Sequence, residues 1–297
     1  MREGTWVDRI YDTLGIGKRE LRQKIDTLVG PSQDELQDEI DNITANFIVD
    51  PKHKAFVDIA IQKDAKLKGK HHKIVEAMLV TYPGVIAVAV HEVAYKLHQE
   101  GNIVEAEHLA AAAKARTGID ISPATTIGEN LFIDHGTGTV IGETAKVGNN
   151  TQIMHKVTLG AYINPQSNDV KDRHPVIGDN CFIGPGTEIL GHVVVGNKVN
   201  ILSKALFTGN KIIVGDGASI RTGAEIEDGC NIAPGVVIGE GAFIHKGSGL
   251  ITKDVPAHSQ VFKDAKGEQF TVDGEPERHR KAEERKARKA EEANRTL

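Results

Sequence analysis

The sequence is poor in aromatic side chains, which make up only 4% of its 297 residues. Aromatic side chains fill much of the volume of a large hydrophobic core, so this composition argues against such a core. Glycine, in contrast, occurs 31 times. Because glycine accepts positive φ and suits tight turns, the composition predicts many turns around a narrow interior lined by small residues.

Cysteine is also scarce, with only Cys181 and Cys230 in the whole chain. Both occupy the small-residue position of the repeat described below. We therefore expect two buried free thiols in a reducing compartment, and neither a disulfide nor a reactive nucleophile.

No apolar run is long enough to cross a bilayer, since the longest covers only residues 85–90. Residues 1–6 lack the apolar stretch of a signal peptide, so we expect a soluble cytoplasmic protein. The net charge of -5 gives no basic field to hold nucleic acid or an anionic membrane, and neither is expected as a partner.

The first 118 residues show helical patterning. Apolar residues follow helix-face spacing at Leu36, Ile40, Ile43 and Phe47. Two further helical stretches run over about 85–99 and 104–116, and Gly118 supplies a left-handed cap for the second. Residues 1–118 are therefore predicted to form an all-helical domain.

From residue 127 onward the apolar period changes to six. A branched aliphatic or Phe returns at every sixth position, with one interruption and one single-residue slip: Ile127, Ile133, Ile141, Val147, Ile153, Leu159, Ile177, Ile183, Ile189, Val195, Ile201, Phe207, Val214, Ile220, Ile226, Ile232, Ile238 and Ile244. This is a hexapeptide repeat, typical of a parallel β-helix.

The physical basis of the repeat is simple. Each short strand points one aliphatic side chain into a triangular core, and a turn-forming residue then rounds the corner, so three hexads close one coil. We predict a left-handed parallel β-helix of roughly six coils over residues 119–260. With the helical domain, the fold class is α+β.

Two segments break the repeat, and a third follows it. Residues 160–175 leave the coil as a protruding loop, and residues 134–139 form a shorter irregularity with Gly136 and Gly138. Loops on a rigid scaffold often carry function. Residues 261–297 form a C-terminal extension, and the charged part, 275–297, is expected to be a solvated helix or disordered.

Both irregular segments contain an Asp and a His, Asp134-His135 and Asp172-Arg173-His174, and Asp120 stands just before the first coil. Here the chain resembles the bacterial serine acetyltransferase family. The matching blocks occur in the family's order: Gly118-Ile119-Asp120-Ile121, Ile133-Asp134-His135-Gly136-Thr137-Gly138, Ile141-Gly142-Glu143-Thr144, Val157-Thr158-Leu159-Gly160 and Asp172-Arg173-His174-Pro175.

The resemblance implies acetyl transfer from acetyl-CoA, as cosubstrate, to the hydroxyl of L-serine in cysteine biosynthesis, with no metal. It implies that His135 is the general base and that Asp120 holds its other ring nitrogen. A hydroxyl is a poor nucleophile until such a base takes its proton, which fits the chemistry.

The resemblance also implies the binding residues. Arg173 would clamp the amino-acid carboxylate, Asp134 would take the ammonium, and His174 would add a contact. A backbone N–H near Thr158, Gly160 and Ala161 would stabilise the oxyanion, and these residues are the predicted coenzyme contacts.

Assembly and regulation follow only in part from the resemblance. We expect a homotrimer, or a dimer of trimers, with one active site per subunit interface. Relatives that dock into O-acetylserine sulfhydrylase, the cysteine synthase partner, end in isoleucine, whereas this chain ends in Leu297, so that partner stays open. Feedback inhibition by cysteine stays open too.

This sequence departs from the family in its helical half. Residues 91–95 read His-Glu-Val-Ala-Tyr where relatives commonly have Tyr-Arg-Ile-Ala-His, and no residue clearly matches the helical-domain acid that binds serine in relatives. The coils over 214–243 look additional to those of the family, and they would change the contacts that the coenzyme makes along the edge of the coils.

Three other functions stay open on the sequence. The acceptor hydroxyl could belong to homoserine, another hydroxy amino acid or a sugar. A trimeric β-helix zinc enzyme would need three histidines, and His135, His155 and His174 lack the expected spacing. A non-catalytic binding protein is the third, since this fold hosts many roles.

Overall fold

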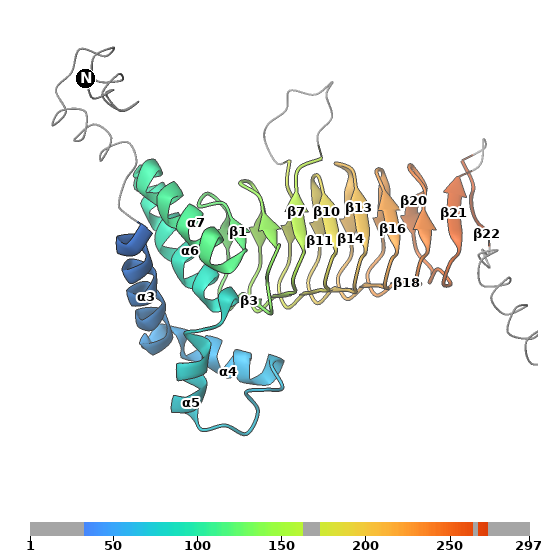
Figure 1. The fold of residues 1–297 in the computed structure, drawn as a ribbon. Helices are drawn as coiled ribbons and strands as arrows, with labels where there is room; N and C mark the ends of the chain where they lie inside the picture. The colour runs from blue at the N-terminus through green and yellow to red at the C-terminus, as the bar shows by residue number, and fades with distance from the viewer. Residues whose placement is uncertain (1–32, 163–172, 264–266, 273–297) are drawn as a thin grey trace, which may run out of the picture.

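A computed structural model describes residues 33–162, 173–263 and 267–272. Helices gather at one end of a long stack of parallel coils, as Figure 1 shows. The predicted fold class, a helical N-terminal part followed by a parallel β-helix, is confirmed. The charged tail and most of the protruding loop, together with residues 1–32, lie outside the described residues.

The helical part consists of five α-helices and one 3-10 turn within the described residues: α3 (Gln33–Val49), η1 (Pro51–His53), α4 (Lys54–Lys63), α5 (His72–Leu79), α6 (Pro83–Gln99) and α7 (Ile103–Thr117). Gly118 ends α7 in the left-handed conformation, with φ of 70°, as the sequence predicts. Helix α6 joins two cores. Val90 and Ala94 pack with α3 and α7, whereas Val85 and Ala89 pack with the core of the coils.

The coils build three sheets, and successive strands from β1 to β20 enter the three sheets in turn. The first sheet runs β1 (Asp120–Ile121), β4 (Val140–Ile141), β7 (Thr158–Gly160), β10 (Glu188–Leu190), β13 (Leu206–Thr208), β16 (Glu225–Glu227), β19 (Phe243–Ile244), β21 (Gln260–Lys263) and β22 (Gln269–Val272). The second runs β2 (Thr126–Ile127), β5 (Lys146–Val147), β8 (Val176–Ile177), β11 (Val193–Val195), β14 (Ile212–Val214), β17 (Cys230–Ile232) and β20 (Gly249–Ile251). The third runs β3 (Phe132–Ile133), β6 (Gln152–Ile153), β9 (Phe182–Ile183), β12 (Asn200–Ile201), β15 (Ser219–Ile220) and β18 (Val237–Ile238).

Register places the hexad aliphatics directly above one another. In the first sheet Ile141 pairs with Leu159, which pairs with Ile189, and all three are buried. The second sheet has seven strands in the described residues, so the stack has about seven coils and not the six predicted. The count was short because the hexads used ran from Ile127 to Ile244 and so left out β1 at the start and β20 and β21 at the end.

Small side chains fill the corners of the coils. Fully buried Thr139, Thr151 and Thr187 each donate a hydroxyl to a backbone carbonyl of the next coil, at 2.9, 3.1 and 2.9 Å. The two cysteines take the same kind of position. Both are free and buried as predicted, and burial raises the pKa of each thiol, which keeps it protonated and unreactive.

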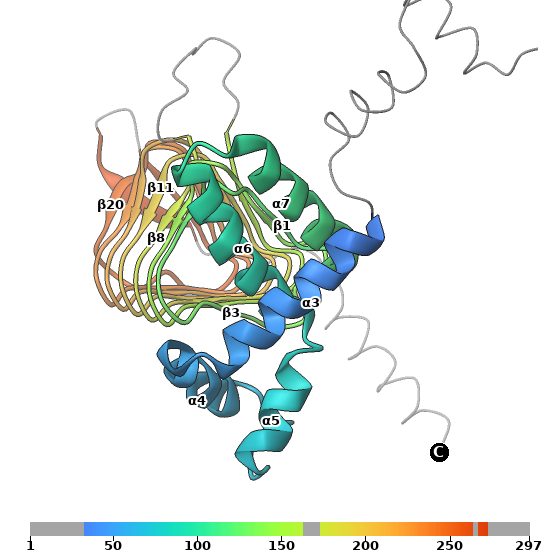
Figure 2. The same cartoon turned by 90° about the vertical axis from the view of Figure 1, so that its left-hand side faces the viewer.

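The two ends of the stack are closed differently. At the first coil, Phe132 lies under the helical part, with its ring 6.3 Å from that of Phe56 in α4, and Figure 2 shows α6 and α7 across this end. At the far end, β22 pairs with β21 in the antiparallel sense, which stops the parallel order of the first sheet.

The helices of the described residues were compared with the length and hydropathy that a membrane span needs. No single helix in the described part of the chain has the length and hydropathy to cross a bilayer, although α5 and α6, bent by 74°, pass that test when joined.

Gly84 in α6 offers a test of the contact between helix and coil. A Cβ at this position would overlap the backbone carbonyl of Ile133. Alanine normally stabilises a helix by about 1 kcal/mol relative to glycine. Here we expect Gly84→Ala to lower the free energy of unfolding by roughly 1–3 kcal/mol because of the overlap.

Urea unfolding followed by circular dichroism measures this change. Lys96→Ala, at an exposed position of the same helix, is the matched control and should leave the stability nearly unchanged. A Gly84→Ala protein more stable than wild type would contradict the close contact.

Candidate active site

The irregular corner over residues 134–139 presents a histidine to solvent. His135, Gly136 and Gly138 have φ of 62°, 61° and 78°, and a Cβ at Gly136 would overlap Ile119 and Ile133. The turn is fixed by hydrogen bonds from the N–H of Gly136 to the carbonyl of Asp134 (2.7 Å) and from Thr139 to Gly136 (2.9 Å). His135 is therefore held at a strained, rigid corner with 60% of its side chain exposed.

The ring of His135 lies between an acid and a second histidine. Its Nε2 is 3.7 Å from Oδ1 of Asp134, a distance for charge attraction and too long for a hydrogen bond. The ring of His155, one coil further on, meets it edge-on at 6.1 Å between centroids. The corner thus combines an exposed base with a carboxylate whose side chain is only 21% exposed.

Asp120, the predicted partner of His135, has a different partner in this structure. Its Oδ2 forms an ion pair with Nζ of Lys114 at 2.6 Å, and no hydrogen bond joins it to His135 among the described residues. The predicted dyad is therefore not assembled here, and the role of Asp120 stays a prediction.

A second acid approaches this corner from the helical part. Asp64, just after α4, is 9% exposed, and its Oδ2 accepts a hydrogen bond of 2.8 Å from the hydroxyl of Tyr82. Burial raises the pKa of Tyr82 to about 12, helped by the bond to Asp64 and by the negative charges of Asp64 and Asp134. Tyr82 therefore lies near both carboxylates and stays protonated.

Asp64 has no distinguishing signal in the sequence. The residue follows α4 in a run of mixed charges, and no periodicity or turn pattern distinguishes it from the other acids. Its approach to Tyr82 depends on how residues 64–71 fold back, which only the packed structure reveals.

Arg173 and His174 lie at a different edge of the coils. They precede β8, at the corner between the first and second sheets, whereas His135 lies at the corner between the third and first. Arg173 donates from Nη2 to Oε2 of Glu143 at 3.2 Å, and the side chains are 41% and 58% exposed. Within one chain, the structure does not bring Arg173 together with His135. Asp172 lies outside the described residues.

His174 is fixed over a glycine. Its side chain occupies the space that a Cβ at Gly142 would take, and it is 6% exposed. The backbone N–H of Thr144 donates to Nδ1 at 3.3 Å, so the neutral ring carries its proton on Nε2. Burial lowers the pKa of His174, the charge of Arg173 lowers it further, and Glu143 opposes this in part.

The predicted coenzyme residues lie on the outer face of the first sheet. Thr158 and Gly160 point outward from β7 and are half-buried, while Leu159 between them is in the core. Ala161 follows the strand and is half-buried. A Cβ at Gly160 would lie 3.0 Å from Leu190 and 3.1 Å from Thr158, so a side chain at this position would crowd both neighbours on the outer face of the sheet.

No group of three or more His, Cys, Asp or Glu side chains in the described ranges is arranged to hold a metal ion. His135, His155 and His174, the three histidines considered for zinc, are split between two edges of the coils.

Comparison with known proteins agrees with the coil architecture. Residues 174–209 match the family model described as bacterial transferase hexapeptide (six repeats). This stretch of the coils is therefore similar to the repeats of that family.

The curated relatives are more specific, because they are serine acetyltransferases. That of Staphylococcus aureus is 41% identical over 124 residues, and that of Staphylococcus epidermidis is 42% identical over the same length. Each match covers 42% of this chain and 56% of the relative. The chain thus spans about half the length of the curated relatives it matches.

Similar solved structures carry the same name. Serine acetyltransferase isoform 3 from Entamoeba histolytica, in complex with cysteine, is 37% identical over 50% of each chain, with a TM-score of 0.44. Serine acetyltransferase from Vibrio cholerae is 25% identical over 82% of this chain and 71% of that one, with a TM-score of 0.45.

The surroundings of His174 predict how its ring titrates. Because burial and Arg173 both disfavour the imidazolium, its NMR titration midpoint should lie below the usual 6.5. Arg173→Ala should raise the midpoint by removing a positive charge, and Glu143→Gln should lower it by removing a negative one.

Arg221→Ala, at an exposed arginine in a distant coil, is the control and should leave the midpoint unchanged. A midpoint of His174 above 6.5 would show that the ring is not buried as described.

Proposed function

We propose that this protein is an acetyl-CoA-dependent O-acetyltransferase that converts L-serine to O-acetyl-L-serine, a step towards cysteine. The observation that carries the proposal is the corner at His135, where an exposed base is held rigidly beside Asp134, with Asp64 and Tyr82 close by. The similarity to serine acetyltransferases supports the choice of substrate.

Asp134 and Asp64 are suited to the ammonium group of serine. Each is mostly shielded from water, at 21% of the side chain and 9% of the residue, so an ammonium there exchanges its hydration for charge-assisted hydrogen bonds. Tyr82 keeps its proton and holds Asp64 in place. Two carboxylates near one position favour a cationic ligand over a neutral hydroxyl compound such as a sugar.

His135 is suited to act as the base. With serine bound at Asp134, the Nε2 side of the ring faces the substrate, and Nε2 removes the hydroxyl proton as the oxygen attacks the acetyl carbonyl. Asp120 would accept the Nδ1–H and stabilise the imidazolium. Its ion pair with Lys114 uses Oδ2, which leaves Oδ1 for this role.

The transfer then completes in two further events. A backbone N–H near Thr158, Gly160 and Ala161 stabilises the oxyanion formed on the thioester carbonyl. When the intermediate collapses, the carbon–sulfur bond breaks and the imidazolium of His135 gives its proton to the CoA thiolate. Acetyl is thus moved from sulfur to oxygen, and the histidine returns to its neutral form.

The clamp for the serine carboxylate would come from a second subunit. Arg173 and His174 lie along a different edge of the coils from His135, so a site containing all three needs two chains. A homotrimer with one site per interface supplies this arrangement. Arg173 brings a guanidinium fork, and His174 brings a neutral ring with its proton on Nε2.

Substitution of His135 tests the base. His135→Ala should lower kcat by roughly 100- to 10,000-fold, the usual range for general acid-base catalysis, with the coils intact. Asp120→Asn should cost less, because the base itself remains. Both variants are compared with the wild type at saturating and at limiting L-serine, so that kcat and kcat/KM are measured separately.

The assay follows thiol release from acetyl-CoA with L-serine, homoserine and a panel of sugars. His192→Ala, at a half-buried position on the coils, is the control and should retain activity. A folded His135→Ala protein with near-wild-type kcat would end this assignment.

Substitution of Arg173 tests the shared site. Arg173→Ala should raise KM for L-serine far more than KM for acetyl-CoA. The loss of a charged hydrogen bond weakens serine binding by about 2–3 kcal/mol, which corresponds to a rise in KM for L-serine of roughly 30- to 150-fold. At limiting serine, each single variant is then nearly inactive.

Mixing the two variants gives the sharper result. If His135 and Arg173 meet across an interface, co-refolded trimers of His135→Ala and Arg173→Ala chains in equal amounts regain about a quarter of the wild-type sites. No recovery, or an active monomer in sedimentation, would contradict the shared site.

A further inference from the structure

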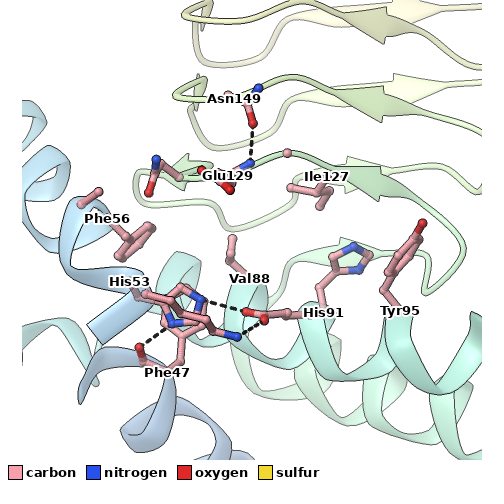
Figure 3. Close-up of a pocket in the computed structure, with 14 residues that line it drawn as sticks. Phe47, His53, Phe56, Val88, His91, Tyr95, Ile127, Glu129 and Asn149 are labelled. Carbon is pink, nitrogen blue, oxygen red and sulfur yellow. Dashed lines mark hydrogen bonds and ion pairs between the residues drawn. The ribbon is translucent and has the colours of Figure 1, made fainter. Parts of the chain in front are cut away.

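A cavity of about 400 Å³ lies between the helical part and the first coils. Its walls come from three places. These are the stretch from α3 through η1 to α4, helix α6, and the corners that join the second sheet to the third. Figure 3 shows these residues facing one another across the space. The volume falls at the lower end of the range for small-molecule sites, roughly 300–1,000 Å³.

Rings form much of the wall. Phe47 stacks on His53 with 3.8 Å between ring centroids, and Phe56 meets Phe47 edge-on at 5.3 Å. Tyr95 closes the other side, 6.0 Å from the ring of His91. Such walls favour a flat apolar body, which gains both from leaving water and from ring contacts.

His91 supplies an unsatisfied polar atom to this apolar space. The residue is 6% exposed and its ring rises from α6 beside Tyr95 (Figure 3). The ring hydrogen-bonds the backbone of Thr125, and burial lowers its pKa to about 4, so it is neutral near pH 7. Nδ1 is buried without a partner among the described residues. The proton is therefore on Nε2, and Nδ1 is an acceptor that needs a donor.

The charges around the cavity favour a neutral or cationic ligand over an anion. Glu92 is neutralised by Lys52 at 2.6 Å, and its other carboxylate oxygen lies 3.0 Å from Nε2 of His53. Glu129, exposed at the rim, has no ion pair within the described residues. An anion would meet this uncompensated carboxylate, whereas a neutral or cationic donor would not.

This cavity is separate from the candidate active site. It opens at the corner between the second and third sheets, where Gly128 and Asn130 lie, and His135 is at the next corner along the coil. None of Asp64, Tyr82, Asp134 or His135 lines it.

We propose that this cavity is a second binding site, for a small molecule with a flat apolar body and a neutral or cationic hydrogen-bond donor directed at Nδ1 of His91. Aromatic amines and ring N–H compounds have this chemistry. The site depends on the helical part and on the coils together, so a ligand bound there stabilises their contact.

A pair of probes tests the proposal by direct binding. Indole has the flat body and one N–H donor, and indene has the same shape without the donor. Calorimetric titration of the full chain should detect one indole site, and indene should bind at least tenfold more weakly. Equal affinity for the two probes would overturn the role of His91.

A variant that fills the cavity locates the site. Ala55 lines the cavity from α4 and is exposed, so Ala55→Trp should fold and should weaken indole binding at least tenfold. Ala111→Trp, at an exposed position of α7 away from the cavity, should bind indole as wild type does. Indole binding unchanged by Ala55→Trp would place it elsewhere, and no binding in the wild type would show a cavity that holds only water.

His91→Leu gives a further measurement that does not depend on activity. If it folds, it should reduce the difference between indole and indene to less than twofold while still binding both. In the wild type, indole should shift the ¹⁵N resonance of His91 Nδ1. A resonance that does not move at saturating indole would contradict a hydrogen bond to that nitrogen.

Discussion

The parallel hydrogen bonding of each coil to the next is the constraint on which the rest of this structure depends. Backbone groups are satisfied only if each strand lies directly over the strand three positions earlier, as Ile141, Leu159 and Ile189 do. That register turns one aliphatic residue and one smaller corner residue of each hexad inward and leaves little choice at the corners. Every functional feature must therefore arise where the chain leaves the repeat or where another element packs against it.

The candidate active site illustrates the first case. At the corner over 134–139, three positive φ values replace the ordinary turn, and His135 points outward because the glycines beside it permit a path that other residues cannot follow. Hydrogen bonds within the corner fix the backbone of His135, and its ring lies between Asp134 and His155. The cavity at His91 illustrates the second case, because its walls are shared by helices and coils.

The sequence predicted what is periodic and missed what is set by packing. The inward aliphatics, the two buried cysteines and the cap at Gly118 follow from local rules, and all are confirmed. The pairing of Asp64 with Tyr82, the ion pair of Lys114 with Asp120 and the cavity at His91 join residues that no spacing relates. Motif order named His135, Asp134 and Arg173 as site residues, but it could not show that they lie on two different edges.

The way the two ends are closed has a consequence for aggregation. An uncovered coil presents unpaired backbone groups in the parallel sense, which is a template for adding another molecule end to end. Helices cover the first coil through Phe56 and Phe132, and at the other end the antiparallel pairing of β22 with β21 ends the parallel order of the first sheet. Both features therefore disfavour the end-to-end stacking by which such a regular repeat would form a fibre.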